Sequence, residues 1–164
     1  MAENSFDIVS KVDMQEVSNA IQQAMKEIGQ RFDFRGSKSS LDLDKEKGEM
    51  HIVSDDEYKL KSVIDILQSK LIKREVPLKS LNYGRIEDAA SGTVKQIVTL
   101  QQGIPAEKSK EIVKVLKNSK LKVQSEIQKD QLRVRAKKID DLQSAIKLLK
   151  EQDFDIHLEF VNYR

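Results

Sequence analysis

Leu-Lys-Val-Gln-Ser-Glu-Ile-Gln-Lys-Asp-Gln-Leu-Arg-Val-Arg-Ala-Lys, residues 121–137, alternates apolar and polar side chains on both sides of a short turn. Alternation with a period of two is typical of a β-strand that has one buried face. Lys129-Asp130 provides a two-residue turn, so the stretch predicts a β-hairpin with strands over 121–128 and 131–137. One face of this hairpin would be apolar and the other polar and basic.

The chain around this hairpin predicts an internal duplication. A helix predicted over 139–150 follows the hairpin, and its apolar positions repeat those of an earlier predicted helix over 56–73. The strand before that earlier helix also matches, since Ile52 precedes Val134 by the same 82 residues that separate Leu60 from Leu142. Self-similarity at a fixed spacing indicates a repeated structural unit.

Each repeat is predicted to have the order β-α-β-β-α-β. In the first repeat a strand over 5–10 precedes a helix over 13–28, which Asp13 would cap at its N-terminus. This order is typical of the α+β ferredoxin-like fold, a four-stranded antiparallel sheet with two helices on one face. We therefore expect two tandem ferredoxin-like units, over residues 1–88 and 89–164, with 84–92 as a linker or a hairpin-like excursion. The opening strands, 5–10 and 93–101, could exchange sheets without any change in the local pattern.

The composition is that of a folded, highly charged protein. Of the 164 residues, 34% are charged and 38% are hydrophobic, and the net charge is only +2. There is no cysteine, which excludes disulfides, thiolate metal sites and a cysteine nucleophile. No apolar run approaches the roughly 20 residues of a membrane span, and the first five residues, MAENS, lack the features of a secretory signal. We expect a cytoplasmic protein without a membrane partner.

The polar face of the hairpin is the first candidate binding surface. On its second strand, Arg133, Arg135 and Lys137 would share the face opposite Leu132 and Val134. On the first strand, the candidate binding residues are Lys122 and Gln124. Arginine and amide side chains suit phosphate groups, and the open sheet face of RNA-recognition domains binds RNA. A solvated face kept polar for solubility fits equally well, and these two strands lack the aromatic residues on which such domains stack bases.

The segment Arg31–Lys38, RFDFRGSK, is the second candidate. It alternates and is predicted to begin a strand, with Phe32 and Phe34 together in the core. Arg35-Gly36-Ser37-Lys38 would suit an anion, because glycine permits close approach of the backbone and polar side chains flank it. Arg31 would lie on the same face as Arg35. The alternative is a β-bulge with exposed charges.

The sequence offers no constellation of catalytic residues. His51 and His157 are the only histidines and have no spacing typical of a metal site. The acidic pairs Asp55-Asp56 and Asp140-Asp141 precede predicted helices, where they suit N-capping better than acid–base catalysis. No phosphate-binding glycine motif of a nucleotide hydrolase occurs. We therefore expect no catalytic residues, no metal, no cofactor and no enzymatic activity.

Several blocks of the sequence closely resemble the YajQ family of bacterial proteins, in order and from end to end. The blocks are 6–10 (FDIVS), 31–38 (RFDFRGSK), 102–104 (QGI), 117–124 (KNSKLKVQ), 140–143 (DDLQ) and 160–164 (FVNYR). The resemblance implies two ferredoxin-like domains with exchanged first strands and the binding of a nucleotide or RNA. It also implies that cyclic di-GMP is a candidate ligand and that a regulatory protein is a candidate partner. Arg135, Ala136 and Ile139 depart from the family pattern, which more often has Thr, Gly and a basic residue there.

Two functions therefore remain open. The first is a non-enzymatic regulatory protein that binds a nucleotide or cyclic dinucleotide. The second is an RNA-binding module that uses the basic sheet face. The two differ in their expected response to salt, because contacts to many phosphates weaken steeply as salt rises.

Overall fold

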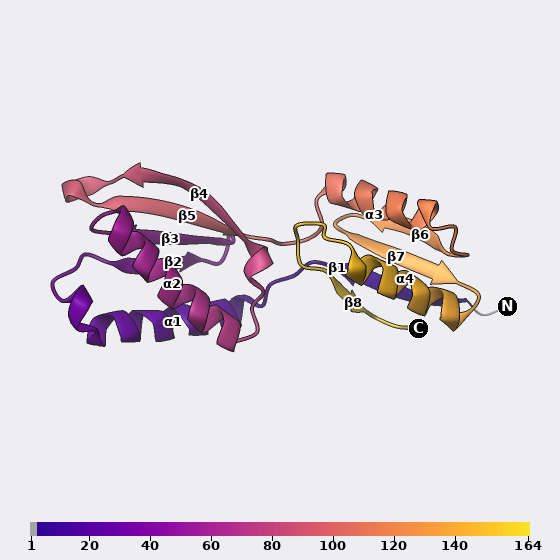
Figure 1. Cartoon of the computed structure of the whole chain (residues 1–164), viewed down its shortest axis with the longest axis horizontal. Coiled ribbons are helices and arrows are strands. Elements are labelled where there is room, and N and C mark those ends of the chain that lie inside the picture. The colour runs from indigo at the N-terminus through magenta and orange to yellow at the C-terminus, as the bar shows by residue number, and fades with distance from the viewer. Residues whose placement is uncertain (1–2) are drawn as a thin grey trace. The chain divides into compact units, whose positions relative to one another are not determined.

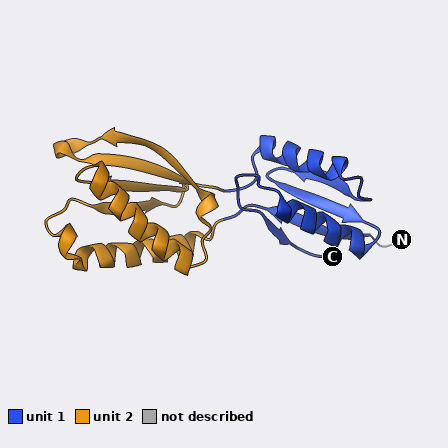
Figure 2. Ribbon diagram, viewed as in Figure 1, with its two compact units in different colours: residues 1–11, 102–164 blue, residues 12–101 orange. Residues whose placement is uncertain are grey.

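The computed structural model describes residues 3–164, which form two compact units (Figures 1 and 2). The first two residues of the expected N-terminal unit lie outside the described part. Unit 1 combines the N-terminal segment up to Lys11 with Gln102–Arg164, and unit 2 is the continuous stretch Val12–Gln101. The chain therefore crosses between the units twice.

Unit 1 is an antiparallel sheet with its strands in the order β6-β7-β1-β8 and with two helices. Its elements are β1 (Asn4–Val9), α3 (Ala106–Asn118), β6 (Gln124–Gln128), β7 (Gln131–Ala136), α4 (Ile139–Glu151) and β8 (Glu159–Val161). Its core joins alternate residues of the central strands, such as Phe6 and Val134, to the inner faces of the helices, such as Ile112 and Leu149. The helices therefore cover one face of the sheet and leave the other face open.

Unit 2 repeats this architecture with the strand order β2-β3-β5-β4. Its main elements are α1 (Met14–Gln30), β2 (Ser40–Asp44), β3 (Glu49–Ser54), α2 (Glu57–Lys73), β4 (Leu81–Asp88) and β5 (Val94–Leu100). Asp13 caps α1 by accepting hydrogen bonds from the backbone N–H groups of Gln15 and Glu16, as expected. The core is continuous from Met50 and Ile52 on the sheet to Leu60 and Leu67 on α2.

The predicted α+β fold with two ferredoxin-like units is confirmed, and the opening strands are exchanged. β1 precedes α1 in the chain but pairs with β7 and β8 in unit 1. β5 precedes α3 but pairs with β3 and β4 in unit 2. The sequence boundary was expected between residues 88 and 89, whereas the compact units divide near Lys11 and Gln101.

One local expectation in unit 2 was wrong. The segment expected to begin a strand at Arg31 instead forms a 3-10 turn, Phe32–Phe34, that directly follows α1. A turn does not place alternate residues on one face, so Phe34 is buried while Phe32 is 82% exposed. Of the two alternatives for 84–92, the hairpin-like excursion is the one present, because β4 continues to Asp88 and pairs with β5 past a bulge between Tyr83 and Ile86.

No helix within residues 3–164 is long and apolar enough to cross a membrane.

Candidate functional site

The alternation predicted for the second hairpin strand is present in β7. Leu132, Val134 and Ala136 are buried against the helices, while the residues between them face away from the core. The register pairs Gln124 of β6 with Arg135, and Glu126 with Arg133. β6 begins at Gln124, so residues 121–123, which were expected to be strand, instead form its lead-in.

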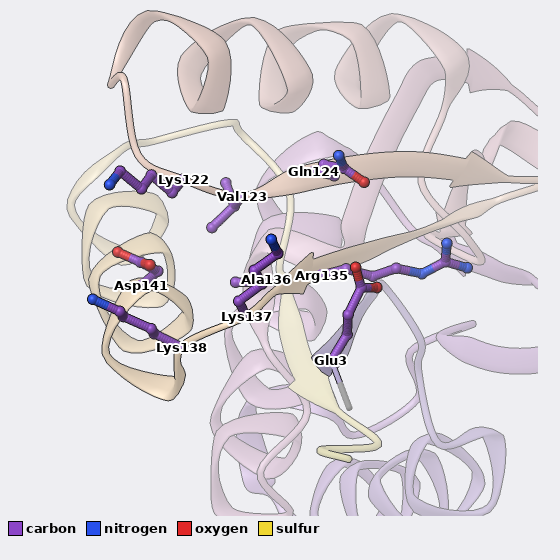
Figure 3. A pocket seen from close by; sticks show the side chains of 9 residues that line it. All are labelled: Glu3, Lys122, Val123, Gln124, Arg135, Ala136, Lys137, Lys138 and Asp141. Carbon is purple, nitrogen blue, oxygen red and sulfur yellow. The ribbon is translucent and has the colours of Figure 1, made fainter. Parts of the chain in front are cut away.

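A cavity of about 480 Å³ opens at the corner where β6 begins, β7 ends and α4 starts (Figure 3). It brings together four of the residues singled out in the sequence: Lys122, Gln124, Arg135 and Lys137. The other residues that line it are Glu3, Val123, Ala136, Lys138 and Asp141. In Figure 3, Lys122, Lys138 and Asp141 lie on the α4 side of the cavity, and Glu3 and Arg135 lie on the opposite side.

The cavity is predominantly cationic. Its lining contributes four cations and two carboxylates, those of Glu3 and Asp141. Arg135 also pairs with Glu126, at 3.0 Å between a guanidinium nitrogen and a carboxylate oxygen, but both side chains remain about half exposed. An exposed pair of this kind is weak and exchanges readily for another anion. The arrangement can therefore hold a negatively charged group.

The start of α4 lacks a side-chain N-cap. The N-cap position is Lys138, whose side chain makes no capping hydrogen bond and cannot accept one. The first N–H groups of a helix lack partners inside the helix and carry partial positive charge. Asp140 and Asp141 lie inside the first turn, where their carboxylates complement the helix dipole as expected, but they do not provide the N-cap.

Arg133 does not line the cavity. Its guanidinium Nε lies 2.9 Å from Oδ1 of Asp7, a carboxylate of β1 that is only 2% exposed. Asn162 donates a second hydrogen bond, of 2.9 Å, to Oδ2 of the same carboxylate. Burial acts to raise the pKa of Asp7, but the hydrogen bonds from Arg133 and Asn162 and the charges of Arg133 and Arg164 outweigh it and hold the pKa below its ordinary value. Arg133 is therefore committed to an internal ion pair.

Arg31 and Arg35 lie in unit 2, at the turn that follows α1. Arg31 pairs with Asp33 at 2.9 Å and with Glu27 at 3.4 Å, and the hydrogen bond to Asp33 raises the pKa of its guanidinium. Arg35 lies over the exposed ring of Phe32, 5.7 Å from its centroid. A small cavity of about 260 Å³ adjoins these side chains.

Lys38 belongs to a loop whose anion-binding groups are already used inside the chain. Its backbone N–H donates to Oδ1 of Asp55 at 3.0 Å, and the Ser37 hydroxyl donates to the other carboxylate oxygen. These two hydrogen bonds hold the pKa of Asp55 below its ordinary value. The loop does bind an anion, but that anion is a side chain of the protein.

Sequence reasoning missed Lys138, Glu3 and Asp141. For Lys138 a signal existed in the Lys137-Lys138 pair, which stands between β7 and α4 where an N-cap acceptor is usual. Nothing in the sequence placed Glu3 at this corner, because β1 reaches unit 1 only through strand exchange. Within residues 3–164, no group of three or more histidine, aspartate or glutamate side chains could hold a metal ion.

Comparison with known proteins assigns the chain to a family. Residues 4–164 match the family model described as nucleotide-binding protein YajQ-like. The chain belongs to the YajQ-like family. A relative from Koribacter versatilis is 61% identical over 100% of this chain and 99% of its own length. Another, from Trichlorobacter lovleyi, is 59% identical over 98% of both chains, and one from Carboxydothermus hydrogenoformans is 56% identical over 98% and 97%.

These YajQ-like relatives are each named a nucleotide-binding protein. The match extends over residues of both units. The family resemblance read from the sequence blocks is confirmed.

Proposed function

We propose that this protein binds a nucleotide and that the phosphate of the ligand enters the cavity between β6, β7 and α4. The observation that carries the proposal is the lining of this cavity of about 480 Å³, to which Lys122, Arg135, Lys137 and Lys138 all contribute. Charge-assisted hydrogen bonds to phosphate are stronger than neutral ones, and several cations around one anion add both energy and direction. The names of the YajQ-like relatives support the same class of ligand.

The proposed role is non-enzymatic and regulatory. The cavity lining contains cations, one amide and two carboxylates, but no serine, histidine or cysteine to act as a nucleophile or a nucleophile's base. A cyclic dinucleotide such as cyclic di-GMP is a candidate ligand, because it offers two phosphates to a cationic cavity. Binding would then be transmitted to a protein partner rather than to a chemical step.

A small nucleotide is favoured over RNA by the state of the sheet face. Arg133 is held by the buried Asp7 carboxylate and is not free to contact a phosphate. The open face is therefore less basic than the sequence pattern alone predicts. RNA that binds across such a face needs many unpaired cations to contact successive phosphates.

A thermal-shift panel of nucleotides, cyclic dinucleotides and a ten-nucleotide RNA tests the proposal. A ligand that binds only the folded state must raise the melting temperature. We expect Lys137→Ala with Lys138→Ala to weaken binding of the active nucleotide about tenfold or more. The charge-matched control is Lys110→Ala with Lys114→Ala, on the exposed face of α3, which should leave the affinity within about twofold.

Salt separates the two ligand classes in the same assay. Affinity for a nucleotide with one or two phosphates should fall modestly between about 50 and 200 mM salt, whereas RNA held by many phosphate contacts should lose orders of magnitude. If no nucleotide in the panel stabilises the protein, or if the α3 control loses as much affinity as the cavity variant, the proposal fails.

A further inference from the structure

Both units have a corner where the first hairpin strand begins, the second ends and the following helix starts. The contacts at the corner of unit 2 can therefore be used to interpret the corner of unit 1. In unit 2 the register pairs Ser40 of β2 with Val53 of β3, and in unit 1 it pairs Gln124 of β6 with Arg135 of β7. Counting outward from these pairs along β3 and β7, Asp55 corresponds to Lys137, and Asp56 to Lys138. Counting back along the partner strands, Lys38 corresponds to Lys122.

In unit 2 the chain fills this corner with its own carboxylates. Asp55 accepts hydrogen bonds from the Lys38 backbone N–H, at 3.0 Å, and from the Ser37 hydroxyl. Asp56 caps α2 by accepting from the Lys59 backbone N–H at 2.7 Å. One anionic group therefore joins the lead-in of β2 to the end of β3, and a second covers the start of the helix.

In unit 1 both carboxylates are replaced by lysines. Lys137 and Lys138 cannot accept a hydrogen bond, so neither can bridge to the lead-in of β6 nor cap α4. At the corner of unit 1 that corresponds to the position of Asp55 in unit 2, the structure has the cavity of about 480 Å³. The replacements also reverse the charge, since Lys122, Lys137 and Lys138 now surround the space.

We infer that a phosphate group of the ligand takes the place in unit 1 that the Asp55 carboxylate holds in unit 2. The phosphate accepts a hydrogen bond from the backbone N–H of Lys122, the counterpart of the Lys38 N–H. Lys137 and Lys138, which stand where unit 2 has two aspartates, neutralise the charge of this phosphate. This inference rests on the proposed nucleotide-binding function and adds to it the group that is recognised and the backbone donor that recognises it.

The inference specifies the chemistry of the ligand. A phosphate monoester or diester has oxygens for the Lys122 amide and for the two lysines at once, as the carboxylate of Asp55 has for two donors. A nucleoside without phosphate lacks the group that enters this corner. Phosphate-bearing ligands should therefore bind here whatever their base, and the corresponding nucleosides should not.

The test is ¹H–¹⁵N NMR of the full chain titrated with inorganic phosphate, with 5′-GMP and 5′-AMP, and with guanosine and adenosine. We expect phosphate and both nucleotides to shift the Lys122 amide and protect it from hydrogen exchange, and both nucleosides to leave it unchanged. Lys137→Asp restores the carboxylate of unit 2. In that variant we expect the Lys122 amide to be protected without ligand and nucleotide affinity to fall about tenfold or more.

Two further variants keep the test decisive. Lys147→Asp makes the same charge change on an exposed position of α4 and should leave the Lys122 amide and the affinity nearly unchanged. Asp55→Ala removes the internal anion of unit 2, and acetate or inorganic phosphate added to this variant should restore part of the lost melting temperature. Wild-type protein should gain no comparable stability from acetate.

The outcomes distinguish this inference from the proposed function. If nucleotides shift the amides of the cavity but phosphate alone does not, and Lys137→Asp binds as wild type does, nucleotide binding stands and the inference is overturned. If no nucleotide shifts any amide between Lys122 and Asp141, both are overturned.

Discussion

The centres of the two sheets differ at corresponding positions, although the strands around them match. In unit 1, Arg133 of β7 lies opposite Asp7 of the exchanged strand β1, and Asn162 completes the hydrogen bonding of that carboxylate. In unit 2, the corresponding pair is His51 of β3 opposite Ile97 of the exchanged strand β5. At this position the exchanged strand of unit 1 thus carries a buried charge, and that of unit 2 carries a half-buried apolar side chain.

This difference shows how each sheet can select the right strand. If β5 entered unit 1, Arg133 would face Ile97 and lose its carboxylate. If β1 entered unit 2, the Asp7 carboxylate would lie opposite His51 without the arginine and amide that hold it. A buried charge without its partner costs several kcal/mol, so the mismatched arrangement is disfavoured. The ion pair contributes specificity of pairing more than net stability.

The largest expected effect comes from removing Arg133. Arg133→Ala leaves the Asp7 carboxylate buried with only Asn162 as a partner, and we expect the melting temperature to fall by about 10 °C or more. Arg135→Ala, which removes the exposed pair with Glu126, is the matched control and should change it by less than about 4 °C. Circular dichroism melts of both variants measure the difference.

A second prediction transfers the His51–Ile97 pair of unit 2 to the corresponding positions of unit 1. Arg133→His combined with Asp7→Ile should recover at least half of the stability lost by Arg133→Ala, because no buried charge then remains unpaired. Equal or greater destabilisation in the double variant would show that packing around these positions, rather than the unpaired carboxylate, sets the cost.

Acid should weaken the same contact. The pKa of Asp7 is held below its ordinary value of 3.8 in the folded protein, so its ionised form contributes stability that is complete above 3.8. That contribution is lost as the pH falls below 3.8 and through the lowered folded pKa. We expect the stability difference between wild type and Asp7→Asn to shrink over this range, as measured by urea unfolding. A difference that stays constant below pH 3.8 would contradict the assignment.

A smaller effect is expected at the start of α4. Lys138→Asp gives this helix the N-cap residue that Asp56 provides for α2, and we expect it to stabilise the protein by about 1 kcal/mol in urea unfolding. The same substitution should weaken nucleotide binding, because it places a carboxylate in the cavity. Lys147→Asp, further along α4, should produce neither change.

The smallest effect is expected for Arg35. Its guanidinium lies over Phe32 in unit 2, and it is not among the residues that line the cavity of unit 1. If that cavity is the nucleotide site, Arg35→Ala should leave nucleotide affinity within about twofold by calorimetry. A larger loss would assign the ligand to the Arg31–Lys38 segment instead.

The sequence was sufficient for the fold because periodicity records which side chains are buried. The alternation in residues 131–137 and the repeated helix positions, such as Leu60 and Leu142, predicted the units, their order and the polar face of β7. The prediction of a strand failed at Arg31–Arg35, because a five-residue alternation also fits a turn that buries Phe34 and exposes Phe32. Short patterns of this kind do not distinguish a strand from a turn.

The candidate site was only half visible in the sequence. Lys122, Gln124, Arg135 and Lys137 could be grouped because they lie on neighbouring strands of one predicted hairpin. Arg133 satisfies the same pattern, but its partner Asp7 is 126 residues away in the chain, and no local pattern reports such a contact. Comparing the acidic pair before α2 with the lysine pair before α4 would have indicated the corner directly.

The exchange of strands also sets an order for folding during synthesis. Unit 2 is one uninterrupted stretch, so all of its sheet has been made once Gln101 leaves the ribosome. β1 is made first, yet the strands that flank it, β7 and β8, are among the last to appear. Phe6 and Ile8 are fully buried in the folded protein. Their side chains therefore lack their packing partners until β7 and β8 have been translated. The core of unit 1 can therefore close only after β7 and β8 have been made.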